Sequence, residues 1–248
     1  MSPSTPRFFA HRFGRAYGPD STRSTLAHVL GGPVDGLETD CCLTSDGRLA
    51  LLHVPFLPSS TTIEGWAHER TAADIVASQV KDRRGGPVDE HPLLLEDLWP
   101  LLDGHRLTVQ LEIKAVLDGE LADRTCRVVC ESLAATPPPA GIHVEVISFW
   151  PECLPIAAAA GWDTRPIIAT PYTPRDFARW AVDQGITGVV LEAPFWSAHH
   201  LDIWRSAGLS LASGVCNDAG FASLLLPFEP DAIATDRPHE LRAELFGS

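Results

Sequence analysis

Short runs of β-branched and other apolar residues alternate with longer helical patterns along most of the chain. The runs predict strands at 7–12, 36–44, 49–53, 106–114, 143–149, 165–170, 187–193, 209–216 and 232–236. Helical patterns lie between most of them, at 24–30, 121–134, 153–160, 175–184, 198–207 and 219–226. This alternation is typical of βαβ units, whose strands lie parallel in one sheet. We therefore expect an α/β fold, a closed (β/α)8 TIM barrel.

The length of 248 residues suits one such barrel, which typically needs about 250 residues. We expect a single domain over residues 1–248. An open, doubly wound sheet is the alternative, but the first predicted strand is not followed by the Gly-x-Gly-x-x-Gly turn that binds dinucleotides.

One segment, 54–102, interrupts the alternation with turn-rich sequence around a single helical pattern at 71–80. It is far longer than an ordinary βα loop of about two to six residues. We expect a short insertion that covers the barrel mouth, where the loops that shape substrate choice lie. Its aromatic residues Phe56, Trp66 and Trp99 could form an apolar wall there, or could only pack the insertion onto the barrel.

The formal net charge of −13 makes nucleic acid a poor partner, because an acidic surface repels phosphates. A small anionic substrate would need a metal or well-placed Arg and Lys side chains. The N-terminal sequence lacks the apolar core of a signal peptide, and no stretch is long enough to span a membrane. We expect a cytoplasmic protein without stable membrane insertion; its oligomeric state is not predicted.

Two acidic residues, Glu38 and Asp40, lie two positions apart in a predicted strand. Alternate residues of a strand share a face, so both side chains point the same way. Two carboxylates in one cavity repel each other unless a cation lies between them. The alternative is an exposed strand end whose acids are solvated.

A second strand carries Gln110, Glu112 and Lys114 on one face and apolar residues on the other. In a barrel the apolar face packs on helices, which turns the polar face inward. Buried charges need partners, so this row favours a functional site over a structural ion pair. Together with Glu38 and Asp40, Glu112 would give three carboxylates, the ligands that Mg²⁺ and Ca²⁺ prefer.

Two histidines, His11 and His53, end predicted strands, and Arg12 follows the first of them. A single histidine at a strand end is usually structural. Two of them beside an arginine suggest acid–base chemistry on a phosphate, because imidazoles exchange protons near neutral pH and a guanidinium binds phosphate oxygens.

These motifs, in this order, resemble the glycerophosphodiester phosphodiesterase family. The resemblance spans about residues 8–240 and rests on His11-Arg12, Glu38-Thr39-Asp40, the Thr-Ser-Asp-Gly turn at 44–47, His53, the Thr-Thr-Ile-Glu-Gly segment at 61–65, the Gln-Leu-Glu-Ile-Lys strand at 110–114, Cys216-Asn217 and the Thr-Asp-Arg-Pro segment at 235–238.

The resemblance implies a metal-dependent phosphoric diester hydrolase on a TIM barrel. Such an enzyme converts a glycerophosphodiester and water into glycerol 3-phosphate and an alcohol. The residue roles that it implies are metal ligation by Glu38, Asp40 and Glu112, acid–base catalysis by His11 and His53, and phosphate binding by Arg12 and Lys114. Asp236 is expected to fix the last strand–helix turn rather than to take part in chemistry.

Some positions depart from the family pattern. Phe13 stands where glycine usually follows His-Arg, Val54 stands where aspartate usually follows the second histidine, and the tryptophan common after the seventh strand is absent. A phospholipase D-like enzyme or a sugar-phosphate diesterase on the same barrel is therefore an alternative. A catalytically silent barrel that binds a phosphorylated ligand is another.

Overall fold

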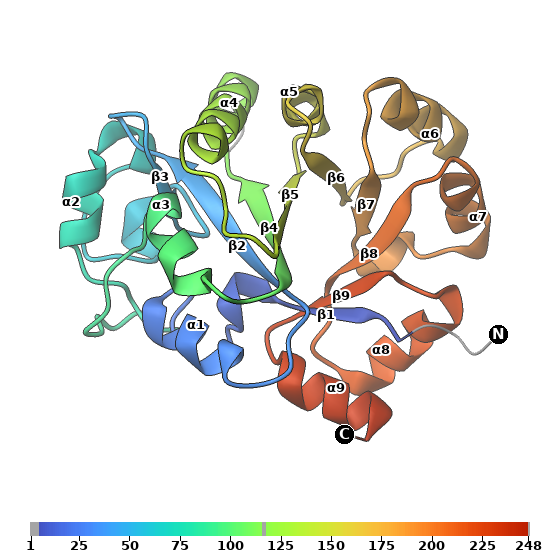
Figure 1. Cartoon of the computed structure of the whole chain (residues 1–248), viewed down its shortest axis with the longest axis horizontal. Helices are drawn as coiled ribbons and strands as arrows, with labels where there is room; N and C mark the ends of the chain where they lie inside the picture. Colours follow the sequence, from blue (N-terminus) through green and yellow to red (C-terminus); the bar gives the residue numbers. More distant parts are fainter. Residues whose placement is uncertain (1–4, 116–117, 248) are drawn as a thin grey trace.

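The computed structural model describes residues 5–115 and 118–247, and its strands form a closed barrel (Figure 1). The parallel strands are β1 (Arg7–Ala10), β2 (Gly36–Leu43), β4 (Leu107–Ile113), β5 (Ile142–Ser148), β6 (Asp163–Ile168), β7 (Gly188–Leu191), β8 (Ser210–Val215) and β9 (Ala232–Thr235). Each of them pairs with the next, and β1 pairs with both β2 and β9, which closes the ring. β3 (Leu49–Leu51) lies outside the ring, antiparallel to β2. The predicted TIM barrel is confirmed.

Helices surround the barrel on its outer side (Figure 1). They are α1 (Arg23–Leu30), α4 (Gly119–Ala135), α5 (Leu154–Ala159), α6 (Pro174–Asp183), α7 (Ala198–Ser206), α8 (Ala219–Leu225) and α9 (Pro238–Phe246). All but α9 match helical patterns in the sequence. That helix was missed because only Pro238 and Leu241 are buried along it, which leaves no clear apolar stripe. Within the described residues, no helix combines the length and the apolar character needed to cross a membrane.

Strand β4 shows how the barrel separates its two faces. Val109, Leu111 and Ile113 belong to the main hydrophobic core, which includes residues of the surrounding helices, while Gln110 and Glu112 line a cavity inside the barrel. A smaller apolar cluster of inward residues lies within the ring and consists of Phe9, Ile147, Ile167, Val190, Ala212 and Ala232. The predicted inward row of polar residues is confirmed.

The insertion at 54–102 lies beside β2 and β3, on the left of the view in Figure 1. It contains α2 (Ala72–Ala77), α3 (Leu95–Leu98) and the 3₁₀ turns Leu57–Ser59, Ala67–Glu69 and Trp99–Leu102. Helix α2 is shorter than predicted, because Ser78 is extended (ψ 163°) and the chain continues into a β-bridge between Val80 and Thr61.

The aromatic residues of the insertion have different roles. Trp99 is only 3% exposed and belongs to the main core, so it packs the insertion onto the barrel. Phe56 is 42% exposed and contacts Trp66, with ring centroids 5.1 Å apart. The prediction that all three aromatic residues could form a wall at the mouth is therefore wrong for Trp99.

Candidate active site

The first strand ends in a sharp turn that presents His11 and Arg12 at the barrel mouth. His11–Phe13 form a 3₁₀ turn directly after β1. Arg12 (φ 49°) and Phe13 (φ 65°) adopt the left-handed backbone region, which non-glycine residues rarely occupy. Such strain persists only where the surroundings hold it, and here the Phe13 side chain is fully buried. Burial of Phe13 thus explains how this chain manages without the expected glycine.

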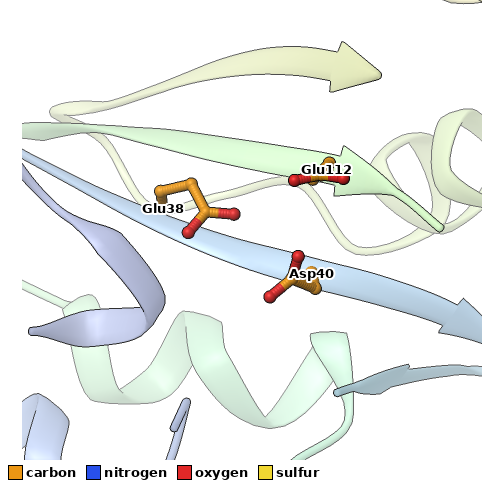
Figure 2. A group of neighbouring side chains, drawn as sticks. All are labelled: Glu38, Asp40 and Glu112. Atoms are coloured by element: carbon orange, nitrogen blue, oxygen red, sulfur yellow. The ribbon is translucent and has the colours of Figure 1, made fainter. Parts of the chain in front are cut away.

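The three predicted metal ligands meet inside the mouth (Figure 2). Glu38 and Asp40 come from β2 and Glu112 from β4, and the parallel register places Asp40 opposite Glu112. All three are buried, and one ligand atom from each lies within 4.8 Å of the others. The alternative of solvated acids at an exposed strand end is excluded.

Two cationic side chains adjoin this acidic cluster. Lys114 Nζ lies 2.9 Å from Asp40 Oδ1 and 2.5 Å from Glu112 Oε1. Arg12 Nε lies 3.7 Å from Asp40 Oδ2, and the Arg12 backbone N–H donates to Glu38 Oε2 at 2.9 Å. The Arg12 guanidinium is shared, because it also bonds to Asp20 at 2.9 Å.

The charges of the cluster shift the proton affinities of its members. Burial, Asp40 and Glu112 raise the pKa of Glu38 well above its ordinary value. Burial also raises the pKa of Glu112 to about 7, although Lys114 opposes the shift. Burial would raise the pKa of Asp40 too, but Lys114, His53 and Arg12 together outweigh burial and lower that pKa.

With all three carboxylates ionised, the cluster would carry more negative charge than Lys114 and Arg12 neutralise. Glu38 Oε1 is buried and has no hydrogen-bond partner within residues 5–115 and 118–247. An unpaired buried carboxylate oxygen is costly, and carboxylate oxygens are the donors that hard divalent cations prefer. The residues present fit such a cation.

His11 has a partner that the sequence did not reveal. Its Nδ1 lies 2.6 Å from Asp236 Oδ1, and its Nε2 lies 3.9 Å from Glu38 Oε2. Asp236 is itself held by Asn217, whose Nδ2 donates to Asp236 Oδ2 at 2.8 Å. Burial would raise the pKa of Asp236, but the hydrogen bond from His11 lowers it. Asp236 is therefore an ionised carboxylate that accepts a hydrogen bond from His11. Asp236 fixes Nδ1 as the protonated nitrogen and leaves Nε2 facing the cluster.

The contact with His11 is additional to the turn role expected of Asp236, whose backbone N–H donates to Asn217 Oδ1 at 2.7 Å. The signal was the Thr-Asp-Arg-Pro segment at the end of the last strand. The contact between this segment and His11 forms only when the barrel closes, because closure places β9 beside β1.

Replacing Asp236 should impair His11 without removing it. We expect Asp236→Asn to lower kcat by about tenfold to a hundredfold, less than the roughly 10²–10⁴-fold effect of losing an acid or base outright. The pH dependence of kcat should shift as well, since the carboxylate no longer stabilises a protonated imidazole. Kinetics from pH 5 to 9 would measure both, with Asp218→Asn on the neighbouring loop as control. An unchanged pH profile would contradict the positioning role.

His53 follows β3 and is half-buried. Burial lowers the pKa of His53 to about 4, although Asp40 opposes the shift, so this imidazole is neutral near pH 7 before substrate arrives. Together with His11, Arg12 and Lys114 it lines a cavity of about 190 Å³ at the mouth. The structure brings all seven sequence-predicted site residues to this mouth.

Three further residues of the mouth were not predicted. Phe149 is 48% exposed, and its ring centroid lies 5.7 Å from Lys114 Nζ. Phe149 and Val215 line the same cavity. Glu192 follows β7 and lines it too, and burial raises its pKa. A side chain at Gly214 would approach Glu192 Oε1 to 2.4 Å, so glycine leaves room for that carboxyl. Single residues after strands carry no motif that could have revealed them.

The chain is a (β/α)8 barrel whose mouth holds an acidic cluster beside two histidines. Among solved structures, the chain is similar to an Oleispira antarctica phosphodiesterase in complex with the product sn-glycerol-3-phosphate, with a TM-score of 0.84 and 19% identity over 97% of this chain and 96% of that one. It is also similar to glycerophosphodiester phosphodiesterase from Thermotoga maritima, with a TM-score of 0.75 and 14% identity over 96% and 97% of the two chains.

Sequence likeness is local. The chain is 35% identical over 69 residues to glycerophosphodiester phosphodiesterase of Bacillus altitudinis, which is 28% of either protein. It is 32% identical over 75 residues to glycerophosphodiester phosphodiesterase of Bacillus subtilis, or 30% of this chain and 26% of that protein. These matches thus span less than a third of either relative. No family model matches the chain. The resemblance to the glycerophosphodiester phosphodiesterase family is confirmed, by fold along nearly the whole chain and by sequence along part of it.

Proposed function

We propose that the chain is a metal-dependent phosphoric diester hydrolase that converts a glycerophosphodiester and water into glycerol 3-phosphate and an alcohol. The observation that carries this proposal is a cluster of three buried carboxylates beside a cavity that two histidines, Arg12 and Lys114 line. A neighbour with the same fold holds sn-glycerol-3-phosphate, which is the product of this reaction.

Glu38, Asp40 and Glu112 would hold one divalent cation, Mg²⁺ or Ca²⁺. When bound, such an ion acts as a Lewis acid that stabilises the negative charge developing on the phosphate. The residues around it supply binding and proton transfer.

Arg12 and Lys114 would bind phosphate oxygens, since both line the cavity and carry positive charge beside the carboxylates. One histidine takes a proton from the nucleophile and the other gives a proton to the leaving oxygen. Asp236 keeps His11 Nε2 turned inward, and His53 adjoins the insertion. The nucleophile is either water or the neighbouring hydroxyl of the glycerol group, which would first form a cyclic phosphate.

Product analysis with purified protein tests this function. Glycerophosphodiesters with different alcohols should release glycerol 3-phosphate in the presence of Mg²⁺ or Ca²⁺. Turnover restricted to lysophospholipids or sugar-phosphate diesters would favour the alternative enzymes. Binding of glycerol 3-phosphate without turnover of any diester would identify a silent binding barrel.

We further propose that the insertion at 54–102 borders the mouth and sets substrate choice. Arg83 donates a hydrogen bond to the Arg15 carbonyl oxygen in the loop after β1, which ties the insertion to that loop. The cytoplasmic location expected from the sequence stays a prediction, which cell fractionation would test.

A further inference from the structure

A second cavity, of about 200 Å³, lies between the insertion and the loop after β1. His53 lines both this cavity and the active-site cavity, so the two are neighbours. Asp20 also connects them, because it bonds to Arg12 at the active site and to Arg15 in the second cavity, each at 2.9 Å. A substituent of a diester bound at Arg12 that extends past His53 would enter this second cavity.

The acidic residues of the second cavity are already engaged. Asp20 accepts hydrogen bonds from both Arg12 and Arg15. Asp82 Oδ1 accepts from the backbone N–H of Arg84 at 2.9 Å and of Gly86 at 3.0 Å. Asp20 is thus paired with two guanidinium groups, and Asp82 Oδ1 holds the turn.

Two cationic residues of the same cavity have only neutral partners. Lys81 Nζ donates to the Pro58 carbonyl oxygen at 2.7 Å, and Arg83 donates to that of Arg15. In the part of the chain that the structure describes, neither forms an ion pair. In a protein of net charge −13, this cavity presents local positive charge that its own acids do not cancel.

The segment that carries these two residues is held in place on both sides. Lys81 pairs with Pro87 in an antiparallel bridge, and the Lys81 backbone N–H donates to the Ser60 carbonyl oxygen at 2.8 Å. Gly85, at φ 81°, closes the turn by donating to the Asp82 carbonyl oxygen. A fixed backbone positions the charges before a ligand arrives, which lowers the entropic cost of binding.

We infer that this cavity binds an anionic group, a second phosphate or a carboxylate, on the alcohol of the diester. This inference rests on the proposed function and deepens it: the preferred substrates are glycerophosphodiesters whose alcohol carries negative charge. Quaternary ammonium groups are usually recognised by cages of Phe, Tyr and Trp side chains, and none of these lines this cavity among the described residues.

Two substrate pairs that each differ by one anionic group test the inference. Glycerophosphoserine differs from glycerophosphoethanolamine by a carboxylate. Glycerophosphoglycerol with a terminal phosphate differs from glycerophosphoglycerol by that phosphate. The wild-type protein should favour the anionic member of at least one pair in kcat/KM by about tenfold, the usual effect of a charge-assisted hydrogen bond. The pair that responds identifies the anion.

The double variant Lys81→Gln with Arg83→Gln should remove this preference, mainly through KM, and leave the other member of each pair within about twofold. Arg84→Gln is the matched control, because Arg84 lies in the same turn but does not line the cavity. Equal rates for both members in the wild-type protein, or an equal loss for both in the variant, would overturn the inference.

Direct binding separates this inference from the proposed function. By calorimetry, the wild-type protein should bind glycerophosphoserine more tightly than glycerophosphoethanolamine, or the phosphorylated glycerophosphoglycerol more tightly than glycerophosphoglycerol. The double variant should show neither difference. If no diester is turned over but this difference persists, the anion site stands and the hydrolase proposal falls. If diesters are turned over without any difference, the hydrolase stands and the anion site falls.

Discussion

Chelation of divalent cations should lower the turnover of glycerophosphodiesters by about two to four orders of magnitude, and Mg²⁺ or Ca²⁺ should restore it. The reason is the acidic cluster of Glu38, Asp40 and Glu112, which lies beside the expected phosphate position. Loss of a Lewis acid removes several kcal/mol of transition-state stabilisation, at about 1.4 kcal/mol per tenfold in rate. Release of glycerol 3-phosphate before and after exhaustive chelation is the measurement. Full turnover by metal-free protein would refute the cation site.

The variant Glu112→Gln gives that prediction a second readout. It should raise the metal concentration needed for half-maximal activity and lower the rate. In the metal-free protein it should instead stabilise the fold, because burial raises the pKa of Glu112 from 4.5 to about 7. The unfolded chain releases this proton near pH 4.5 and the folded protein keeps it to about pH 7, so the stability of the metal-free protein falls as pH rises between them.

Calorimetry on metal-free protein at pH 8 should therefore show Glu112→Gln melting a few degrees above the wild-type protein. Glu131→Gln, on the exposed side of α4, is the matched control for loss of one negative charge. A lower melting temperature for Glu112→Gln would mean that Lys114 already compensates this carboxylate.

Replacing either mouth histidine should be nearly as damaging as removing the cation. His11→Ala and His53→Ala should each lower kcat by roughly two to four orders of magnitude, the usual range for a lost acid or base. Neither should unfold the protein, since both side chains lie at the mouth rather than in the hydrophobic core. His199→Ala is the control, because His199 is exposed in the first turn of α7.

The pH profile of the wild-type protein adds to this test. If one histidine must be neutral while the other is protonated, the rate should rise and fall with pH in a bell shape. Burial lowers the pKa of His53 to about 4, so the acidic limb of kcat/KM should lie well below pH 6. Folded, metal-loaded His53→Ala with near-full activity would show that this protein uses another proton donor or acceptor.

The polar rows of the site could be predicted because strand periodicity is local. Glu38 and Asp40 share a face of one strand, and Glu112 and Lys114 share a face of another. A parallel register then brings the two faces together, as the pairing of Asp40 with Glu112 shows. Neither step requires knowledge of how distant parts of the chain pack.

What could not be predicted depends on contacts between distant segments. Asp236 meets His11 across 225 positions, and only ring closure brings them together. Glu192 is a single acid after a strand, a position without a distinctive pattern. Trp99 turned inward to the core although it lies in the insertion, because burying a large apolar ring outweighs a place at the mouth.

Ring closure by β1 and β9 has a consequence for the order of events during synthesis. The ribosome releases His11 225 positions before Asp236, and β1 has only one of its two neighbours until β9 emerges. The carboxylate cluster draws only on β2 and β4, and both strands leave the ribosome long before Asp236 can orient His11. The complete site should therefore form in one late step, when β9 docks, and a chain halted before that strand would lack the contact between His11 and Asp236.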